Sequence, residues 1–455
     1  MARRLAAVGS VRRDGDFALT TPRFRFLRLA LFWEQEGAFA YRTTGCMRLF
    51  AVALWVGLLL MGSGARNAPT RRDSDWLIRV GLEQGAFAPV VYVGVSAGSL
   101  RWGDPRTGRT LGIGDAGQVW ELRRENGRYV AHSGTARIVA ERLVAEPAGE
   151  GFAMVGVSPG ALRRYRGHLE WVERNGKLLT INWVRLDDYL KATLPREMPP
   201  NFHIEALKAQ AVAARSFTFR RLNRYRQWGY DLCDHAPCQV YGGVDAEHPN
   251  TNLAVEATSG EVLTYNGRVL EAVYTGSCGG HTAPIEVAMI GTQPLAPLRG
   301  APDTDANGKP FCSLAPNFVW ELALTREELS RCFPKAGRVQ EVTITQRTAG
   351  GHVQQVRIRG TRATLTLSGA EFRAAVGAGR IRSLMFEVQP TREGWRLVGR
   401  GSGHGAGLCQ WGAQGRALAG QTYRQILQAY YSDATLEGSP HIRNTPNLVS
   451  GTGAL

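Results

Sequence analysis

The sequence predicts a mixed α+β fold, in which antiparallel, β-rich lobes and packed helices surround a substrate cleft. Short apolar or alternating runs, separated by Gly, Asp and Asn turns, fill the chain from about Asp75 to Leu178. Helical periodicity begins at Leu186, and helix-like and strand-like segments then follow one another to about Tyr431. The length of 455 residues allows two or three domains, or one large domain with extensions.

The chain is strongly basic, with 55 Lys and Arg against 39 Asp and Glu and a net charge of +16. A basic protein is attracted to polyanions, which include nucleic acid, anionic lipid and the anionic polymers of a cell wall. We find no aromatic-basic RNA-binding motif and no zinc-finger spacing, so we expect no nucleic-acid partner. The alternative, that the excess charge only solvates the surface, stays open.

The first 65 residues have the pattern of an export signal. A basic residue follows Met47, and the apolar run 49–61 leads to small residues that end at Ala65. This run is too short to span a bilayer comfortably and is typical of a secretory signal. We interpret 47–65 as a signal peptide and 1–46 as a non-native extension, with an uncleaved membrane anchor as the alternative. Both place the remainder outside the cytoplasmic membrane, in the periplasm or on the cell-wall side, with membrane contact limited to this segment.

Residues 75–178 form the predicted β-rich N-terminal part. Asn126-Gly127 and Asn175-Gly176 are typical hairpin turns. No catalytic residue stands out here, so we expect a structural support, with a glycan-binding module as the alternative. The expected strands are Trp76–Leu82, Val90–Val95, Val119–Leu122, Tyr129–His132, Arg137–Leu143 and, leading onward, Leu178–Val184.

Two helices are predicted after this part. The first covers Leu186–Leu194 and is ended by Pro195, and the pair Pro199-Pro200 prevents any helix from continuing through it. The second is long and is expected to start from an N-cap at Asn201. One face of it carries mostly small residues that allow close packing, namely Leu207, Ala211, Ala214 and Thr218.

Glu197 lies on the predicted tight connection between these two helices. Such a position presents a carboxyl group to a cleft while half burying it, and burial raises the pKa of a carboxyl group. A general acid that works near neutral pH needs a raised pKa. Glu197 is therefore the candidate catalytic residue, and a structural role in the helix connection is the alternative.

Cysteine and histidine residues recur after the long helix. Cys233, His235, Cys238 and, further along, His281 offer the sulfur and nitrogen ligands that tetrahedral zinc prefers. The alternative is a disulfide or free thiols, because an exported protein usually pairs its cysteines. A third hypothesis makes Cys278 a nucleophile with His281 or His404 as its base, although no oxyanion donor can be named.

A glycine-rich loop, 399–415, surrounds His404 near the C-terminus. Alternate glycines allow a backbone to approach a ligand or another strand closely. The loop lacks the Lys-Ser/Thr of a phosphate-binding loop, so that alternative is discounted. His404 is expected to orient Glu197, to contact substrate, or to pack under the loop. The other candidate cleft residues are Arg215, Gln239, Tyr241, Ser277, Thr282 and Gln410.

The region from Asp75 to Ser432 resembles the SpoIID/LytB family of cell-wall proteins. The likeness rests on 186–190 (LDDYL), on Glu197-Met198-Pro199, on 205–215 (EALKAQAVAAR) and on the glycine-histidine loop. In the sporulation branch, the glutamate of the E-M-P triplet is the catalytic acid of a peptidoglycan lytic transglycosylase, so the resemblance assigns that role to Glu197. Some members hold zinc near the cysteine-histidine segment, but Pro237 stands here where a histidine is expected.

The resemblance implies a substrate and a mechanism. Glu197 would protonate the glycosidic oxygen between N-acetylmuramic acid and N-acetylglucosamine, and then accept the proton of the muramic acid 6-hydroxyl. The expected partner is therefore a peptidoglycan glycan strand. The LytB branch resembles an amidase enhancer, so the alternative is a non-catalytic wall-binding protein whose partner is a cell-wall amidase.

The predicted catalytic core covers 179–438, and 439–455 is expected to be a disordered tail. Within the core, 294–337 is interpreted as a surface insertion closed by a disulfide between Cys312 and Cys332. A hairpin through Asn266-Gly267 precedes it. The later strands are expected at Val339–Ile344, Val353–Ile358, Ala363–Leu367, Phe386–Gln389 and Trp395–Val398, and the helices at Thr325–Cys332, Ser368–Val376 and Thr422–Tyr431.

Overall fold

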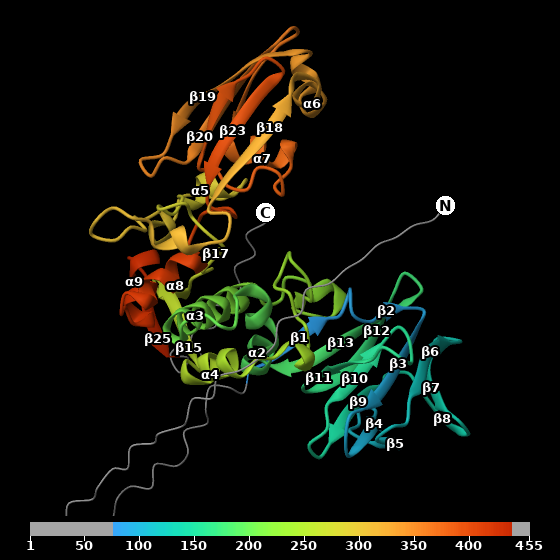
Figure 1. The fold of residues 1–455 in the computed structure, drawn as a ribbon. Helices are drawn as coiled ribbons and strands as arrows, with labels where there is room; N and C mark the ends of the chain where they lie inside the picture. The colour runs from blue at the N-terminus through green and yellow to red at the C-terminus, as the bar shows by residue number, and fades with distance from the viewer. Residues whose placement is uncertain (1–75, 439–455) are drawn as a thin grey trace, which may run out of the picture. The chain divides into compact units, whose positions relative to one another are not determined.

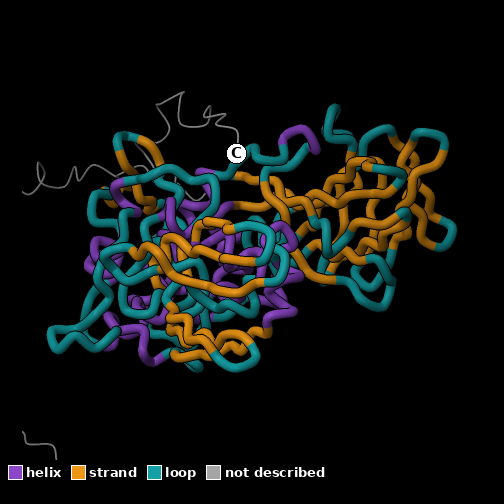
Figure 2. The backbone as a smooth tube through the Cα atoms, turned by 90° about the horizontal axis from the view of Figure 1, so that it is seen from above, coloured by secondary structure: helices purple, strands orange, loops and turns teal. Residues whose placement is uncertain are grey.

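The computed structural model describes residues 76–438 (Figure 1). Mainly antiparallel sheets and packed helices occur together in this part, which confirms the predicted α+β class. Figure 2 shows most helical segments lying together and the strands in separate groups. None of the described helices is long and apolar enough to cross a membrane. The predicted extension 1–46, signal 47–65 and tail 439–455 lie outside the described residues.

Two sheets make up the N-terminal part, and their hairpins have the predicted turns. Asn126 and Gly127 have φ of 47° and 79°, as the favoured two-residue hairpin turn requires. The first sheet has the order β14-β1-β13-β12-β9-β4-β5, with β2 beside β13 (Leu232–Cys233, Leu77–Gly81, Lys177–Arg185, His168–Arg174, Val144–Ala148, Ser99–Gly103, Thr110–Asp115; β2 is Phe87–Ala88). The second has the order β11-β10-β3-β6-β7-β8 (Arg163–Tyr165, Ala153–Gly156, Val90–Val95, Trp120–Glu125, Arg128–Ser133, Ala136–Ala140).

Tryptophans fill the core of this part. The Trp102 ring lies 5.4 Å from the Trp120 ring and 5.8 Å from the Trp171 ring, centroid to centroid. Large aromatic side chains contribute the most buried area to a core. Strand β13 leaves this core and leads directly into the first helix, where the Leu186 N–H donates to the Trp76 carbonyl at 2.8 Å. The site helix therefore starts from a rigid support.

Helix α2 covers Leu186–Glu197 and passes through Pro195, so the prediction that Pro195 ends this helix is wrong. A proline inside a helix removes one N–H donor and so breaks one helical hydrogen bond, but it does not prevent the bonds that follow it. The chain keeps its helical bond beyond the proline, since the Met198 N–H donates to the Leu194 carbonyl at 3.0 Å. Glu197 is consequently the last residue of α2, and Met198 caps it.

Helix α3 covers Ile204–Arg220 and is the centre of the helical part. Its N-cap is His203, whose Nδ1 accepts from the Glu205 N–H at 3.2 Å, so the prediction of Asn201 as the cap is wrong. The predicted small-residue face is confirmed as buried. It packs against α2, α4 (Pro249–Ala257), α8 (Gln410–Leu418), α9 (Tyr423–Tyr430) and β15 (Glu261–Tyr265).

Two small sheets complete the surroundings of α3. The first has the order β16-β15-β25, with β16 at Arg268–Val269 and β25 at Thr435–Gly438. The second is a parallel pair of β17 (Tyr274–Thr275) and β24 (Leu408–Cys409), which brings the glycine-rich loop beside β17. Helix α5, Ile285–Ala288, follows β17.

A second hydrophobic core lies within residues 319–400 and extends beyond the predicted insertion 294–337. Trp320, Phe333 and Phe372 are among its buried residues. Its sheets have the orders β18-β23-β22 (Val319–Thr325, Gly394–Arg400, Phe386–Pro390) and β19-β20-β21 (Val339–Arg347, Val353–Gly360, Thr364–Ser368), with helices α6 (Arg326–Cys332) and α7 (Gly369–Val376).

The predicted disulfide between Cys312 and Cys332 is wrong. Both thiols are free. Cys312 is buried in the first core, whereas Cys332 packs against the second. The two side chains therefore belong to different packed units and cannot pair.

Candidate active site

Glu197 stands where the chain leaves α2, and its backbone is held in place. The Gln410 side-chain amide donates to the Glu197 carbonyl at 2.9 Å. The next residue, Met198, is 1% exposed and anchors the connection in the core. Because Gln410 is the first residue of α8, the glycine-rich segment and the E-M-P triplet meet at this carbonyl.

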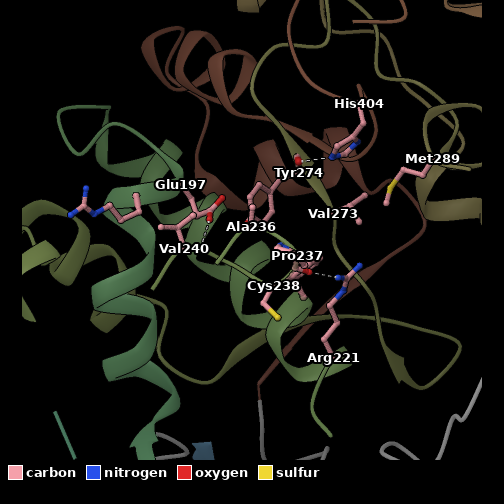
Figure 3. Close-up of a pocket in the computed structure, with 12 residues that line it drawn as sticks. Glu197, Arg221, Ala236, Pro237, Cys238, Val240, Val273, Tyr274, Met289 and His404 are labelled. Atoms are coloured by element: carbon pink, nitrogen blue, oxygen red, sulfur yellow. Dashed lines mark hydrogen bonds between the residues drawn. The ribbon is translucent and has the colours of Figure 1, made fainter. Parts of the chain in front are cut away.

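A pocket of about 380 Å³ opens beside the Glu197 carboxylate. Figure 3 shows Glu197 and the Tyr274 ring pointing toward one another inside it. Its walls come from the end of α2, from α3 and the residues after it, from the 236–240 loop, from β17 and from the glycine-rich loop. The lining residues are Arg196, Glu197, Phe217, Arg221, Ala236, Pro237, Cys238, Val240, Val273, Tyr274, Met289 and His404.

The Glu197 carboxylate has two hydrogen-bond donors. The Val240 N–H donates to Oε1 at 3.0 Å, and the Tyr274 hydroxyl is the second donor. Burial raises the pKa of Glu197, and both donors oppose that rise because they favour the ionised form. Burial is the largest of these effects, so Glu197 holds a proton to higher pH than an exposed glutamate does.

Tyr274 is oriented by a buried chain of hydrogen bonds. The Gln239 amide nitrogen donates to the Tyr274 oxygen at 3.0 Å. The Gln239 carbonyl oxygen accepts from Thr218 at 2.7 Å and from Tyr189 at 3.2 Å, which sets the orientation of the amide. With its oxygen already accepting from Gln239, the Tyr274 hydroxyl is directed to donate to Glu197.

His404 holds β17 in place and does not contact Glu197. Its Nε2–H donates to the Tyr274 carbonyl at 2.8 Å, and its Nδ1 accepts from the Ala406 N–H at 3.2 Å. This pairing is the assignment that satisfies both partners. Burial lowers the pKa of His404 to about 4, so the imidazole is neutral at physiological pH. Of the three predicted roles for His404, packing under the loop fits these bonds, direct orientation of Glu197 does not, and contact with substrate stays a prediction because His404 also lines the pocket.

Glycine is required where the loop presses on β17. A Cβ at Gly407 would lie 1.9 Å from the Val273 carbonyl, and one at Gly403 would lie 2.2 Å from the Thr275 hydroxyl. Both glycines also have positive φ. The glycines therefore allow the loop to lie directly against β17. This contact places His404 within hydrogen-bond distance of the Tyr274 carbonyl.

A disulfide between Cys233 and Cys238 shapes the wall that carries Val240. The wall is also held by Arg221, whose guanidinium donates to the Pro237 carbonyl at 3.0 Å and to Glu271 at 2.8 Å. A short cross-linked loop has few conformations. The Val240 N–H is thereby fixed at the Glu197 carboxylate.

The four residues of the predicted zinc set do not come together. Cys233 and Cys238 form a disulfide, as the alternative prediction had it. Zinc is bound by thiolates, and the sulfurs of a disulfide are not thiolates. His235 lies beside Asp234, with 3.3 Å between Nδ1 and Oδ1. The His281 Nδ1–H donates to the Thr282 carbonyl at 2.7 Å. These residues do not fit zinc ligation in this arrangement.

Arg215 and Tyr241, predicted to bind substrate, lie instead in the core. The Arg215 side chain is 1% exposed and pairs with Asp187, with 3.0 Å between the nearest nitrogen and oxygen. It also donates to the Val255 and Glu261 carbonyls, and so joins α2, α3, α4 and β15. The Tyr241 hydroxyl donates to Asn182 at 2.8 Å within the buried interior. Neither side chain is accessible to a polymer.

The other predicted polar residues fall into two groups. Gln239 and Gln410 act on the pocket indirectly, through Tyr274 and through the Glu197 carbonyl. Ser277 is 2% exposed and Thr282 is 1% exposed, and neither lines the pocket.

Tyr274 and the Val240 amide are functional groups that the sequence analysis missed. Tyr274 lies just before Ser277 and Cys278, whose hydroxyl and thiol are the more obvious candidates for chemistry in this segment. A single tyrosine in a strand is an ordinary core residue, and no local pattern marks its hydroxyl. For Val240 the chemistry comes from the backbone, which the side-chain sequence does not show.

Comparison with known proteins places this architecture in a family. Residues 174–265 match the family model SpoIID, described as Stage II sporulation protein, and 315–407 match a domain of unknown function, DUF8618. An uncharacterised protein of Brachyspira hyodysenteriae is 30% identical over 62% of this chain and 73% of its own length. Stage II sporulation protein D of Bacillus subtilis is 28% identical, over 63% and 81%. The amidase enhancer of the same species is 29% identical, over 54% of this chain and 40% of its own length.

The matched segment 174–265 contains β13, α2 and α3, and with them Glu197 and the Val240 amide. The match thus covers the pocket walls that come from α2, α3 and the 236–240 loop, whereas β17 and the glycine-rich loop lie outside it. The chain belongs to the SpoIID/LytB family. The module with the second hydrophobic core corresponds to the second matched domain.

Proposed function

We propose that this protein is a peptidoglycan lytic transglycosylase that cleaves the bond between N-acetylmuramic acid and N-acetylglucosamine, with Glu197 as its acid and base. The observation that carries the proposal is that Glu197 is the single carboxylate among the described residues that line the pocket, with its pKa raised by burial. The names of the relatives, a sporulation protein and an amidase enhancer, support a role at the cell envelope.

The proposed reaction needs one carboxyl group. Protonated Glu197 gives its proton to the glycosidic oxygen as the bond from C1 of muramic acid breaks, and an oxocarbenium-like transition state forms. The 6-hydroxyl of the same sugar then bonds to C1 and returns its proton to Glu197. The product is a 1,6-anhydro sugar, and no water is consumed.

The lining of the pocket distinguishes this reaction from ordinary glycoside hydrolysis. Hydrolases of that kind use two carboxylates about 5–10 Å apart, one of which acts on water or on the sugar. Among the described residues that line the pocket, Glu197 is the one carboxylate. An intramolecular hydroxyl in place of water removes the need for the second group.

Tyr274 and the Val240 amide affect the balance between the protonated and the ionised form of Glu197, which act as acid and as base. Both donate to the carboxylate and stabilise it after it has lost its proton. Burial opposes them and keeps the proton available before bond cleavage. The balance gives a group that can first donate a proton and then accept one.

Glu197→Gln tests the proposal directly. Purified peptidoglycan digested by the wild type should release 1,6-anhydro-muropeptides, detected by mass spectrometry, and the variant should release none. Glu256→Gln is the matched control, because Glu256 lies on α4, outside the pocket, with a largely exposed side chain. Anhydro products at the wild-type rate from the Glu197 variant would refute the assignment.

A second candidate function is favoured by one relative. The amidase enhancer matches this chain at 29% identity, so a wall-binding protein that stimulates an amidase is the alternative. In that case the wild type would sediment with insoluble peptidoglycan and release no anhydro sugar. Adding a cell-wall amidase would then increase release of stem peptides, and Glu197→Gln would leave that increase unchanged.

A further inference from the structure

Four buried side chains outside the pocket converge on one point. They are Cys278, Asp303, Cys312 and Cys409, and each is at most 1% exposed. Their sulfur and carboxylate oxygen atoms all lie within 4.8 Å of one another. Among the described residues, this is the one group of three or more potential metal ligands that converges in this way.

The spacing of the donor atoms is that of a tetrahedral metal site. A zinc–sulfur distance of about 2.3 Å puts two thiolates about 3.8 Å apart and a thiolate and a carboxylate oxygen about 3.5 Å apart. The sulfurs of Cys278 and Cys312 are 3.8 Å apart, and the Cys278 sulfur is 3.2 Å from Oδ2 of Asp303. The side chains therefore have nearly the required geometry already.

Neighbouring groups support negative charge on these ligands. The Cys409 sulfur accepts from the Cys278 N–H at 3.2 Å and from the Gly412 N–H at 3.3 Å. Oδ1 of Asp303 accepts from Tyr430 at 2.7 Å and from Arg416 at 3.1 Å, which leaves Oδ2 directed at the sulfurs. Partners that orient ligands from behind in this way are typical of metal sites.

We propose that Cys278, Asp303, Cys312 and Cys409 bind one structural zinc ion. Thiolate ligands at tetrahedral spacing select zinc over the hard cations, which prefer oxygen. All four positions are supplied by the protein and are buried, so the site has no open coordination position and its role is structural. The site is separate from the sequence-predicted set, with which it shares no residue.

A disulfide accounts for this cluster less well than a metal does. Three cysteines cannot pair completely, and a disulfide between two of them would leave one thiol and the Asp303 oxygen without a strong partner. Elsewhere in this structure Cys233 and Cys238 are joined, whereas the cluster cysteines are free. The fourth donor is a carboxylate at ligand distance, which a disulfide does not need.

The proposed zinc would join three separate segments next to the candidate active site. Cys278 follows β17, which carries Tyr274, while Cys409 ends β24 and is followed by Gln410. Asp303 and Cys312 come from the segment that precedes β18. The chain thus enters the second module just after Cys312 and returns from it just before Cys409. One ion would hold the base of that module and the strand pair β17-β24 together.

Metal content of the whole chain tests the proposal. The protein is refolded with zinc under reducing conditions, freed of excess metal, checked by circular dichroism and measured by elemental mass spectrometry. We expect about one zinc per chain. Cys409→Ser and Asp303→Asn should lower that content, whereas Cys332→Ser and Cys233→Ser should not, because these two cysteines lie outside the cluster.

Cobalt gives a second readout that does not depend on variants that fold poorly. Wild-type protein loaded with Co²⁺ should show thiolate-to-cobalt charge-transfer absorption and the visible bands of a tetrahedral ion. Folded wild type that holds no stoichiometric metal would overturn the proposal. So would a mapped disulfide among Cys278, Cys312 and Cys409, or equal metal loss in Cys332→Ser. Glu197→Gln should keep its zinc, so the metal site and the lytic activity are tested independently.

Discussion

Removing the Tyr274 hydroxyl is the sharpest perturbation of the candidate site. Tyr274→Phe keeps the ring in the pocket wall but deletes the donor to Glu197 and the acceptor of the Gln239 amide. A hydrogen bond to a charged group contributes about 1.5–3 kcal/mol. Since this bond favours the ionised carboxylate, its loss raises the pKa of Glu197 further.

The expected result is a displaced pH profile. One pH unit corresponds to about 1.4 kcal/mol, so the alkaline limb of the rate of anhydro-muropeptide release should move up by about one pH unit or more. The direction follows because bond cleavage needs protonated Glu197, and the variant holds that proton to higher pH. Initial rates at a series of pH values, with product measured by mass spectrometry, give the midpoint.

The same variant separates a tuning role from a packing role. Gln239 loses an acceptor in the buried interior, which costs about 1–3 kcal/mol of the free energy of unfolding. That loss alone would lower the amount of folded enzyme at every pH and leave the midpoint where it was. An alkaline limb that stays in place, or moves to lower pH, would refute the assigned hydrogen bond.

Three further predictions concern stability. Burial raises the folded-state pKa of Glu197 above the usual value of a glutamate, so its stabilising contribution is present at low pH and is lost as pH rises through the folded pKa. Glu197→Gln should therefore unfold at higher urea than wild type at about pH 8 and show little difference at about pH 4, whereas a structural glutamate would give a loss at pH 8. Cys238→Ser opens a disulfide of sequence separation 5 and should cost roughly 2 kcal/mol, measured by urea unfolding under oxidising conditions, with no further loss when reductant is added. Asp187→Ala leaves the Arg215 guanidinium buried without its ion partner and should cost about 3–5 kcal/mol, whereas a substrate-binding Arg215 would show reduced wall binding at unchanged stability.

The local pattern of the sequence was enough to predict most elements. Strand Val90–Val95 and the Asn-Gly hairpins follow from residue types that are adjacent along the chain. The sequence placed Glu197 on the connection after a helix that ends at Leu194, whereas Glu197 is the last residue of α2, because the helix continues through Pro195.

The roles of single polar residues depended on neighbours that are distant in the sequence. Arg215 lies in a strongly patterned helix, yet its task is set by Asp187 and by two carbonyls from other elements. The spacing in the sequence suggested a disulfide between Cys312 and Cys332, whereas packing places Cys312 beside Cys278 and Asp303. Spacing along the chain does not report such contacts.

The sequence by itself determined the fold class and the course of most helices and strands, and it marked Glu197 as the candidate acid, because periodicity, turn chemistry and a contiguous motif are local properties. Only the tertiary structure decided what surrounds that carboxylate. The Val240 amide reaches Glu197 from 43 residues away in the sequence, and the Gln410 side chain reaches it from 213 residues away. The Tyr274 hydroxyl likewise comes from a distant segment. The burial that raises the Glu197 pKa is likewise a property of packed segments, because each segment alone would leave the carboxylate in water.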